Sequence, residues 1–302
     1  PDEAPLRARR RLFLTGTPIF TRPIGMWRVI RACDPQGLGS NWWRFADRYC
    51  GASSANKWDT TGHQNEEELQ FKLRSSFMIR REKNDVMEEI PSARHTIRFS
   101  SAGLERLVST ELTTFSERLA RFEADALDER ELLGIDDLDV FATLSPTSRQ
   151  ELALAKLRMC IEWIEELLLV EKKVVVFAHH REVVKKLASA FPGSVCVMGG
   201  TAASERDAAR ERFQTDPACR VFVGNIRAAG TGISLSAADV VVFIELSWSP
   251  SENTQAEERV WLPEKTRPIS VYRLVVEGSL DEAISAVLDR RQESIAQTMS
   301  RK

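Results

Sequence analysis

The 302-residue sequence has no run of about 18 apolar residues, which excludes a helix that spans a membrane. The arginines near the N-terminus are not followed by the apolar core of a secretory signal peptide. The five cysteines are scattered and never spaced as C-x-x-C, so the sequence indicates neither a disulfide framework nor a zinc site. We therefore expect reduced, mostly buried thiols in a cytosolic protein, or a nuclear one if the source is eukaryotic.

The sequence also lacks a large excess of charge of either sign. Its formal net charge is −2, which gives no general attraction to nucleic acid. Its content of 43% apolar and 28% charged residues is typical of a globular protein, and its length suffices for two domains. Charge is locally uneven, because residues 74–83 are basic whereas residues 123–139 carry eight acidic side chains and one arginine.

Residues 1–100 predict several helices and only one strand, at 11–14 (RLFL). This inventory is unusual for a whole domain and fits the end of a larger one. The helices are expected from Pro23 to Cys33, after a cap at Ser40, and at 65–77.

Residues 101–152 are expected to connect this part to the next. A long helix is predicted at 103–127. Ser148 and Glu151 have the spacing of a capping box, so a further helix is expected to start there and to reach Val170.

Residues 153–302 alternate short β-branched runs with helical segments. This pattern predicts an α/β fold in which six parallel strands are covered by helices on both faces. Because ligands of such sheets bind at the carboxyl ends of the strands, the loops that follow the strands are the candidate site. The clearest strands are KVVVFAHH, SVCVM, CRVFV, DVVVFIEL and ISVYRLV, with helices at 181–191, 204–214, from Ser251 onward and at 280–298.

The loops that follow the strands each permit an ordinary structural interpretation. The sequence GTG at 230–232 is consistent with a tight turn as well as with a phosphate-binding loop. His179 and His180 have no further ligands at metal-binding spacing, so inward packing of one ring is preferred and no metal ligand is assigned. Trp248 fits a packed corner, and Arg259 fits a solvated charge on a helix.

The order of these segments nevertheless resembles the SNF2 family of superfamily 2 ATPases over nearly the whole chain. The resemblance is nearest to the branch that contains the annealing helicases. LTGTPI at 14–19 is similar to motif III, VVVFAHH at 174–180 to motif IV, and GTGISLSAA at 230–238 to motif V. The segment ELSWSPSENTQAEER at 245–259 is similar to the family's tryptophan-containing motif and the start of motif VI.

The resemblance implies that ATP, together with Mg²⁺, binds between two RecA-like lobes. Residues 1–100 would be the end of the first lobe, residues 101–152 a helical inter-lobe protrusion, and residues 153–302 the C-terminal lobe.

The site residues implied by the resemblance follow from the matching motifs. Arg259 is the expected catalytic arginine finger, because a guanidinium neutralises charge in the transition state of phosphoryl transfer. The residues expected to bind ATP are Gly230, Gly232, Gln255 and Arg259, and those of the coupling motif III are Thr15, Gly16, Thr17 and Pro18.

Double-stranded or forked DNA is the implied partner, and further protein subunits are compatible with the family. DNA contacts in such motors go mainly to phosphates and carry little sequence information. Ordinary helix starts and turns would account for each candidate residue equally well. The candidates are Arg181, Thr201, Ser247 and Trp248.

Two departures from the family pattern limit what the resemblance implies. Leu262 stands at the position of the second motif VI arginine, where it can neither donate a hydrogen bond nor carry charge. No G-x-x-x-x-G-K-[ST] segment and no Asp-Glu pair precede motif III. The phosphate-cradling loop and the magnesium-binding carboxylate are therefore expected upstream of this sequence, and the chain by itself is expected to be inactive.

The leading hypothesis is the C-terminal portion of a motor that uses ATP hydrolysis to move on duplex DNA. The alternative is a non-catalytic DNA-binding or scaffold module derived from such a motor, and Leu262 is the main observation in its favour. An unrelated Rossmann-type metabolic enzyme would need a dinucleotide fingerprint, which is absent. An RNA helicase is disfavoured because ELSWSP and the long inter-lobe helices resemble SNF2 proteins more closely.

Overall fold

The structure is a computed structural model in which the chain divides into two compact units. The first comprises Pro1–Met87 and Asp125–Asp137, and the second comprises Glu88–Ala124 and Leu138–Lys302. Within the described residues, no helix combines the length and the apolar character that crossing a membrane requires. The structure describes residues 8, 10–14, 23–51, 60, 64–79, 81, 92–125, 146–229, 232–262, 265–286 and 288.

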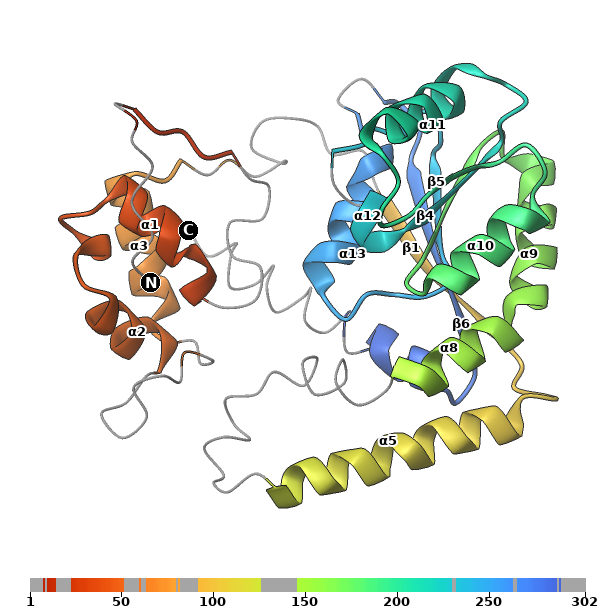
Figure 1. The fold of residues 1–302 in the computed structure, drawn as a ribbon, viewed down its shortest axis with the longest axis horizontal. Coiled ribbons are helices and arrows are strands. Elements are labelled where there is room, and N and C mark those ends of the chain that lie inside the picture. Colours follow the sequence, from red (N-terminus) through yellow and green to blue (C-terminus); the bar gives the residue numbers. More distant parts are fainter. Residues whose placement is uncertain are drawn as a thin grey trace. The chain divides into compact units, whose positions relative to one another are not determined.

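The second unit is built on a six-stranded sheet in which every pair of neighbouring strands is parallel. The strand order is β1-β6-β5-β2-β4-β3, so the chain crosses the sheet repeatedly through helices (Figure 1). This confirms the predicted α/β fold class. The strands are β1 (Ser92–Phe99), β2 (Val174–Ala178), β3 (Val195–Val197), β4 (Val221–Asn225), β5 (Val240–Phe243) and β6 (Ile269–Val276).

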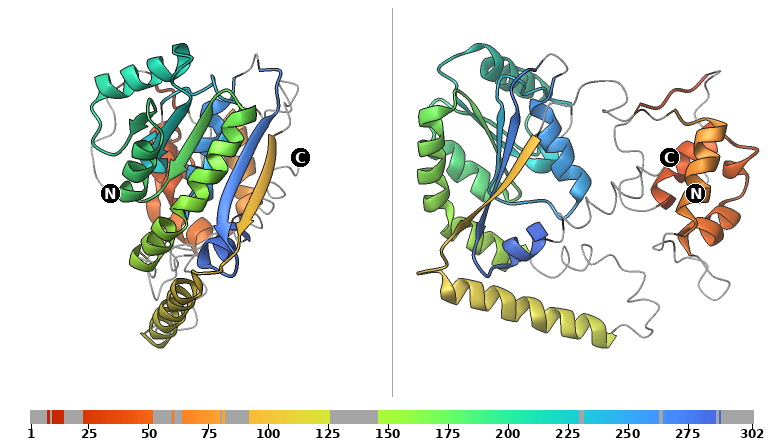
Figure 2. Two further views of the ribbon diagram at one scale, coloured as in Figure 1. Left: turned by 90° about the vertical axis from the view of Figure 1, so that its right-hand side faces the viewer. Right: turned by 180° about the vertical axis from the view of Figure 1, so that it is seen from behind.

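The six strands are not all where the sequence pattern put them. Five of them lie within 153–302, and the sixth is β1, which precedes the long helix and pairs with β6 over its whole length. Figure 2 shows these two strands side by side at one edge of the sheet. Its many polar side chains hide this strand from a search for buried β-branched runs, because an edge strand is only partly covered.

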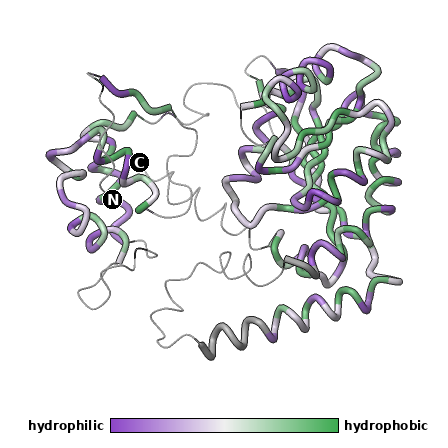
Figure 3. The backbone as a smooth tube through the Cα atoms, in the orientation of Figure 1, coloured by the Kyte–Doolittle hydropathy of each residue, from purple (hydrophilic) through white to green (hydrophobic). Residues whose placement is uncertain are grey.

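Both faces of the sheet are covered by helices, as the continuous apolar strands require (Figures 1 and 3). Val174 and Val176 pack with α9 and α10 on one face, whereas Val175 and Phe177 pack with α11, α12 and α13 on the other. The helices are α9 (Leu157–Val170), α10 (Arg181–Ala190), α11 (Ala203–Thr215), α12 (Ile226–Ala229), α13 (Pro250–Glu257) and the 3-10 turn η3 (Glu258–Val260).

The connecting region contains the predicted long helix, now bounded as α5 (Glu105–Asp125). The predicted helix at 148–170 is split into α8 (Pro146–Ala155) and α9, with Lys156 between them. Ser148 therefore lies inside α8 and does not cap it, because Pro146 already supplies a favourable first position. The closing helix is described from Leu280 to residue 286 and at residue 288.

The first unit is helical and has its own small core of Trp27, Ile30, Phe45, Tyr49 and Leu69 with their neighbours. The cap of its second helix was predicted one residue too early: Asn41 accepts a hydrogen bond from the Arg44 amide at 3.1 Å, and Ser40 belongs to the preceding 3-10 turn. Its elements are η1 (Pro23–Met26), α1 (Trp27–Cys33), η2 (Leu38–Ser40), α2 (Trp42–Cys50) and α3 (Glu66–Ser76).

The strand predicted at 11–14 is not formed. These residues have no regular secondary structure, and the Leu12 and Leu14 side chains are 83% and 86% exposed. A strand needs a neighbour for its backbone N–H and C=O groups, and these residues pair with none of the described ones. The coupling segment Thr15, Gly16, Thr17 and Pro18 lies outside the described residues.

Candidate functional site

The candidate residues of the second unit gather on loops and helices that follow the carboxyl ends of the strands. Arg181 follows β2, Thr201 follows β3, and Gly232 comes after the short helix behind β4. Gln255 and Arg259 lie on α13 and η3, behind β5. Ligands of parallel sheets bind at the edge where the loops after the strands begin. Gly230 lies outside the described residues.

Helix α13 holds Gln255 and Arg259 on its less buried side. Pro250 occupies the first turn of α13. Ala256 and Val260, which are fully buried in the core, hold α13 and η3 against the sheet. The Arg259 Nε donates to the Gln255 carbonyl oxygen at 3.1 Å. Burial lowers the pKa of Arg259, with the charge of Glu258 acting against this effect. The guanidinium thus sits in a partly dehydrated place, where its attraction to an anion is stronger than in water.

The loop that precedes β5 is fixed against the same helix. The Leu235 amide donates to the Arg259 carbonyl oxygen at 2.7 Å. Gln214 on α11 holds the other side of the loop: its Nε2 donates to the Ser234 carbonyl at 3.0 Å, and its Oε1 accepts from the Ala237 amide at 2.8 Å. Gly232 opens the described part of this loop at a φ of 74°, a conformation that favours glycine. Gln214 was not identified from the sequence, because its role depends on contacts distant along the chain.

Ser247 and Trp248 are built into the structure that supports α13. Ser247 is 2% exposed, and its hydroxyl donates to Glu252 at 2.5 Å while accepting from the Ser249 amide. Its backbone exchanges two hydrogen bonds of 2.8 Å with the Asn253 side chain. The Trp248 ring packs against the core, with the Arg149 guanidinium 4.8 Å from its centroid.

Arg181 and Thr201 differ in whether their side chains already form described hydrogen bonds with neighbouring residues. Arg181 is exposed at the first position of α10, where the helix dipole also favours an anion. The Thr201 hydroxyl accepts from the Met198 amide at 3.1 Å, which closes the turn after β3. Of the four candidates for DNA contact, Arg181 alone carries a charge, and it is exposed.

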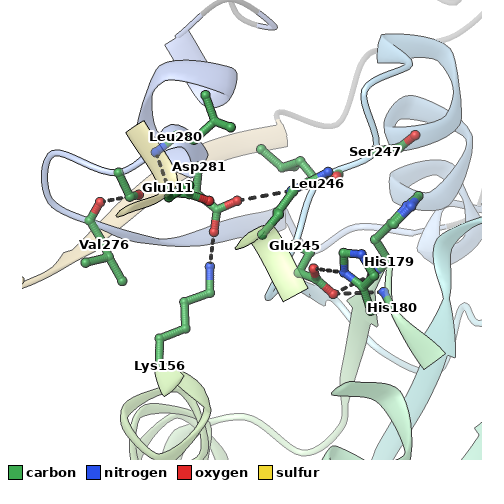
Figure 4. A network of polar contacts seen from close by, with 12 residues as sticks. Glu111, Lys156, His179, His180, Glu245, Leu246, Ser247, Val276, Leu280 and Asp281 are labelled. Atoms are coloured by element: carbon green, nitrogen blue, oxygen red, sulfur yellow. Dashed lines mark hydrogen bonds and ion pairs between the residues drawn. The ribbon is translucent and has the colours of Figure 1, made fainter. Parts of the chain in front are cut away.

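Glu245 organises the turn between β2 and α10 (Figure 4). Its carboxylate accepts from the amides of His179 and His180 at 3.0 and 2.9 Å and lies 2.5 Å from His180 Nδ1. Burial acts to raise the pKa of Glu245, but the hydrogen bond from His180 and the charge of Arg149 hold it at about 2. Because an ionised carboxylate only accepts, the proton on this side of the His180 ring lies on Nδ1.

The inward-packing interpretation of the histidine pair agrees with their surroundings. Burial, reinforced by the charges of Arg149 and His180, lowers the pKa of His179 to about 4, so this ring is neutral at pH 7. Among the described residues there is no group of three His, Cys, Asp or Glu side chains that could hold a metal ion.

Behind this turn lies a buried ionic cluster that the sequence did not reveal (Figure 4). Lys156, at the break between α8 and α9, forms an ion pair with Asp281 and donates to the Leu274 carbonyl at 2.8 Å. Arg149 lies 3.4 Å from Asp281 and donates to the Leu246 carbonyl. Charged residues within helical segments normally indicate a solvated face, so only the fold identifies these as buried.

Comparison with known proteins finds a matching domain and similar proteins. The model of the helicase conserved C-terminal domain matches residues 156–262. The chain is 32% identical over 308 residues to the DNA annealing helicase and endonuclease ZRANB3 of Mus musculus, a match that covers 97% of this chain and 27% of the relative. It is 29% identical over 298 residues to the SWI/SNF-related matrix-associated actin-dependent regulator of chromatin subfamily A-like protein 1 of Drosophila melanogaster, covering 96% of this chain and 37% of that relative.

The chain is similar to SNF2 proteins along nearly its whole length. This confirms the resemblance derived from the motif order, although the chain spans only 27% and 37% of the length of these two relatives. Among solved structures, the Sulfolobus solfataricus SWI2/SNF2 ATPase core in complex with dsDNA is similar at a TM-score of 0.49 and 18% identity, over 95% of this chain and 62% of that chain. The matched helicase C-terminal domain begins at Lys156 and ends at Leu262, the residue that departs from motif VI.

The buried ionic cluster predicts an unusual dependence of stability on pH. Burial and the charge of Asp281 raise the pKa of Glu111, on α5, from 4.5 to about 7. Between these values the folded protein binds more protons than the unfolded chain, so Glu111 lowers stability as the pH rises. His179 acts oppositely, because its folded pKa of about 4 lies below its ordinary 6.5. Between pH 4.5 and 6.5, the loss of stability with rising pH that Glu111 causes and the gain that His179 causes therefore oppose each other.

We expect Glu111→Gln to remove the loss of unfolding free energy with rising pH that the Glu111 carboxyl causes. Relative to the native protein, the free energy of unfolding of the variant should rise by up to about 3 kcal/mol between pH 4.5 and pH 7.5. Urea denaturation at a series of pH values measures this difference. Glu117→Gln, at an exposed position of the same helix, is the control and should give no slope. A difference between Glu111→Gln and native protein that does not change with pH would contradict the prediction.

Proposed function

We propose that this chain is the C-terminal portion of an ATP-dependent motor that moves on double-stranded DNA. The observation that carries the proposal is the placement of Gln255 on α13 and Arg259 on the adjoining turn η3, next to each other on the segment that follows β5 of the RecA-like sheet. An amide and a guanidinium are suitable donors for the terminal phosphate of ATP. Mg²⁺ would take its protein ligands from outside the described residues.

The residues present fit the role of stabilising phosphoryl transfer. Arg259 is partly buried and is already oriented through its Nε, which leaves the remainder of the guanidinium fork for an anion. The Leu235–Arg259 backbone hydrogen bond ties the motif V loop to the finger segment. We propose that Arg259 supplies positive charge to the transition state, and that Gly232 lets the loop backbone approach the phosphates closely.

The second candidate is a non-catalytic DNA-binding or scaffold module derived from such a motor, here called a retired motor. Leu262 is the observation that favours it. In the position of the second arginine, Leu262 is 37% exposed, whereas the neighbouring Trp261 packs against the core. The leucine therefore fills no core site and offers no charge to a phosphate. The first candidate remains the better supported one, because Arg259 and its surroundings are intact.

Binding to DNA should follow the rules of phosphate recognition. We expect weak, sequence-independent binding of a labelled duplex by this chain, decreasing steeply between low and moderate salt because released counterions supply the affinity. In the full-length protein, the same duplex should stimulate ATP turnover. Fluorescence titration at two salt concentrations and a turnover assay with and without duplex measure both effects. Tight binding to one sequence over its scrambled control, or turnover indifferent to DNA, would exclude the proposed motor.

A further inference from the structure

An ion pair joins the edge strand β1 to the helix that carries the proposed ATP-facing residues. Arg94 donates from Nε and Nη2 to Glu257 Oε2, at 3.0 and 2.6 Å. The Glu257 side chain is 7% exposed, so its charge is almost fully removed from water. The other carboxylate oxygen, Oε1, has no hydrogen-bond partner among the described residues. Arg94 therefore supplies both hydrogen bonds by which described residues hold this carboxylate.

The pair is formed because β1 presents Arg94 on the face of the sheet covered by α13. Arg94 is in register with Val271 of β6, and paired residues of parallel strands point to the same face. Val271 packs in the same apolar cluster as Ala256 and Val260, which anchor α13 and η3. The guanidinium thus reaches the buried side of the helix from the edge of the sheet.

Helical geometry places Glu257 opposite the two residues that face the proposed substrate. On α13, at about 100° per residue, Gln255 is about 160° from Glu257 around the axis. Arg259 lies on the following 3-10 turn, where about 120° per residue puts it about 120° from Glu257. Their burial agrees, because Glu257 is buried and the other two are only partly so. A group that holds Glu257 consequently fixes the rotation of the helix about its axis, and with it the direction of Gln255 and Arg259.

We propose that Arg94 is a positioning residue for the Gln255–Arg259 segment, acting through Glu257. The proposal rests on the proposed function, since the direction of Arg259 matters only if it faces ATP. Without Arg94, a buried carboxylate would lose its counter-charge and would turn the end of α13 toward water. An error of about 1 Å in a group that acts on the transition state reduces turnover by up to about 100-fold.

The test compares two arginines of the same strand. Arg98 pairs with Glu282 at 2.6 Å, on a more exposed part of the surface, so its described partner lies on the closing helix and not on α13. We expect Arg94→Ala in the full-length protein to lower the kcat of DNA-stimulated ATP hydrolysis by about 10- to 100-fold with the KM for ATP changed less than about twofold. Amide hydrogen exchange should increase in peptides covering 250–262. Arg98→Ala should do neither, and Arg94→Lys should recover part of both.

Hydrogen exchange separates this inference from the proposed function. If native protein does not hydrolyse ATP, the proposed function is wrong. Hydrogen exchange in residues 250–262 then tests by itself whether Arg94 holds this segment in place. If exchange in 250–262 is the same in Arg94→Ala and Arg98→Ala, Arg94 positions nothing. If exchange increases while kcat stays native, the positioning role in turnover is overturned. Exchange increased throughout the second unit would mean general destabilisation, which also overturns the inference.

Discussion

Replacing Arg259 by alanine in the full-length protein should lower DNA-stimulated ATP turnover by about 10³-fold or more, because the side chain acts on the charge of the transition state. The fold should survive the change. Among described contacts, the side chain makes a single hydrogen bond, to the Gln255 carbonyl, and neither residue is part of the buried core. We therefore expect a melting temperature within a few degrees of the native value. A turnover assay on the purified variant, with thermal melting alongside, measures both quantities.

Leu262→Arg is the matched variant that separates a working motor from a retired one. Because Leu262 is 37% exposed, an arginine there would reach water and should cost little stability. In a working motor the native protein already hydrolyses ATP, and this variant should change turnover only modestly. In a retired motor, turnover stays near background before any mutation. Native-like turnover in Arg259→Ala would end the assignment of Arg259 as the finger.

Replacing Asp281 by alanine should destabilise the second unit by about 3–5 kcal/mol, since it leaves two buried cations without their shared carboxylate. Lys156 is fully buried and Arg149 nearly so, and both face Asp281. Neither cation can reach water without unpacking the helices around it. Urea denaturation of native and variant protein at pH 7 measures the loss as a shift of the transition midpoint.

The neighbouring residue provides the control for Asp281. Glu282 pairs with Arg98 on the exposed surface, and Glu282→Ala should cost about 1 kcal/mol or less. A second variant tests the cause: Lys156→Met in the Asp281→Ala background removes a stranded charge and should recover part of the stability. Equal costs for Asp281→Ala and Glu282→Ala would show that the buried pair is not what holds this region.

How much could be predicted from the sequence depends on how local the determining interactions are. The fold class and the strands β2 to β6 were predictable, because buried parallel strands appear as apolar runs of short length. The family was predictable from the order of its motifs. The edge strand β1 was missed, because its mostly polar sequence is typical of a loop and only the pairing with β6 makes it a strand.

The candidate site was predictable only in part, for the same physical reason. Gln255 and Arg259 stand in a recognisable motif, and their spacing puts them on one side of a helix. Gln214, Glu245 and Arg94 carry no local signal, because each acts on a segment that is distant in sequence. The roles of Arg259 and of the DNA-contact candidates remain predictions.

The pairing of β1 with β6 has a consequence for the synthesis of the protein. Ser92 finds its partner at Ile269, so every other strand of the sheet leaves the ribosome before the last one that β1 requires. At about 5–20 residues per second, β1 waits on the order of ten to thirty seconds with unpaired backbone groups. Its arginines repel another copy of the same strand during that interval. The charges that later fasten the strand are thus expected to keep nascent chains from associating.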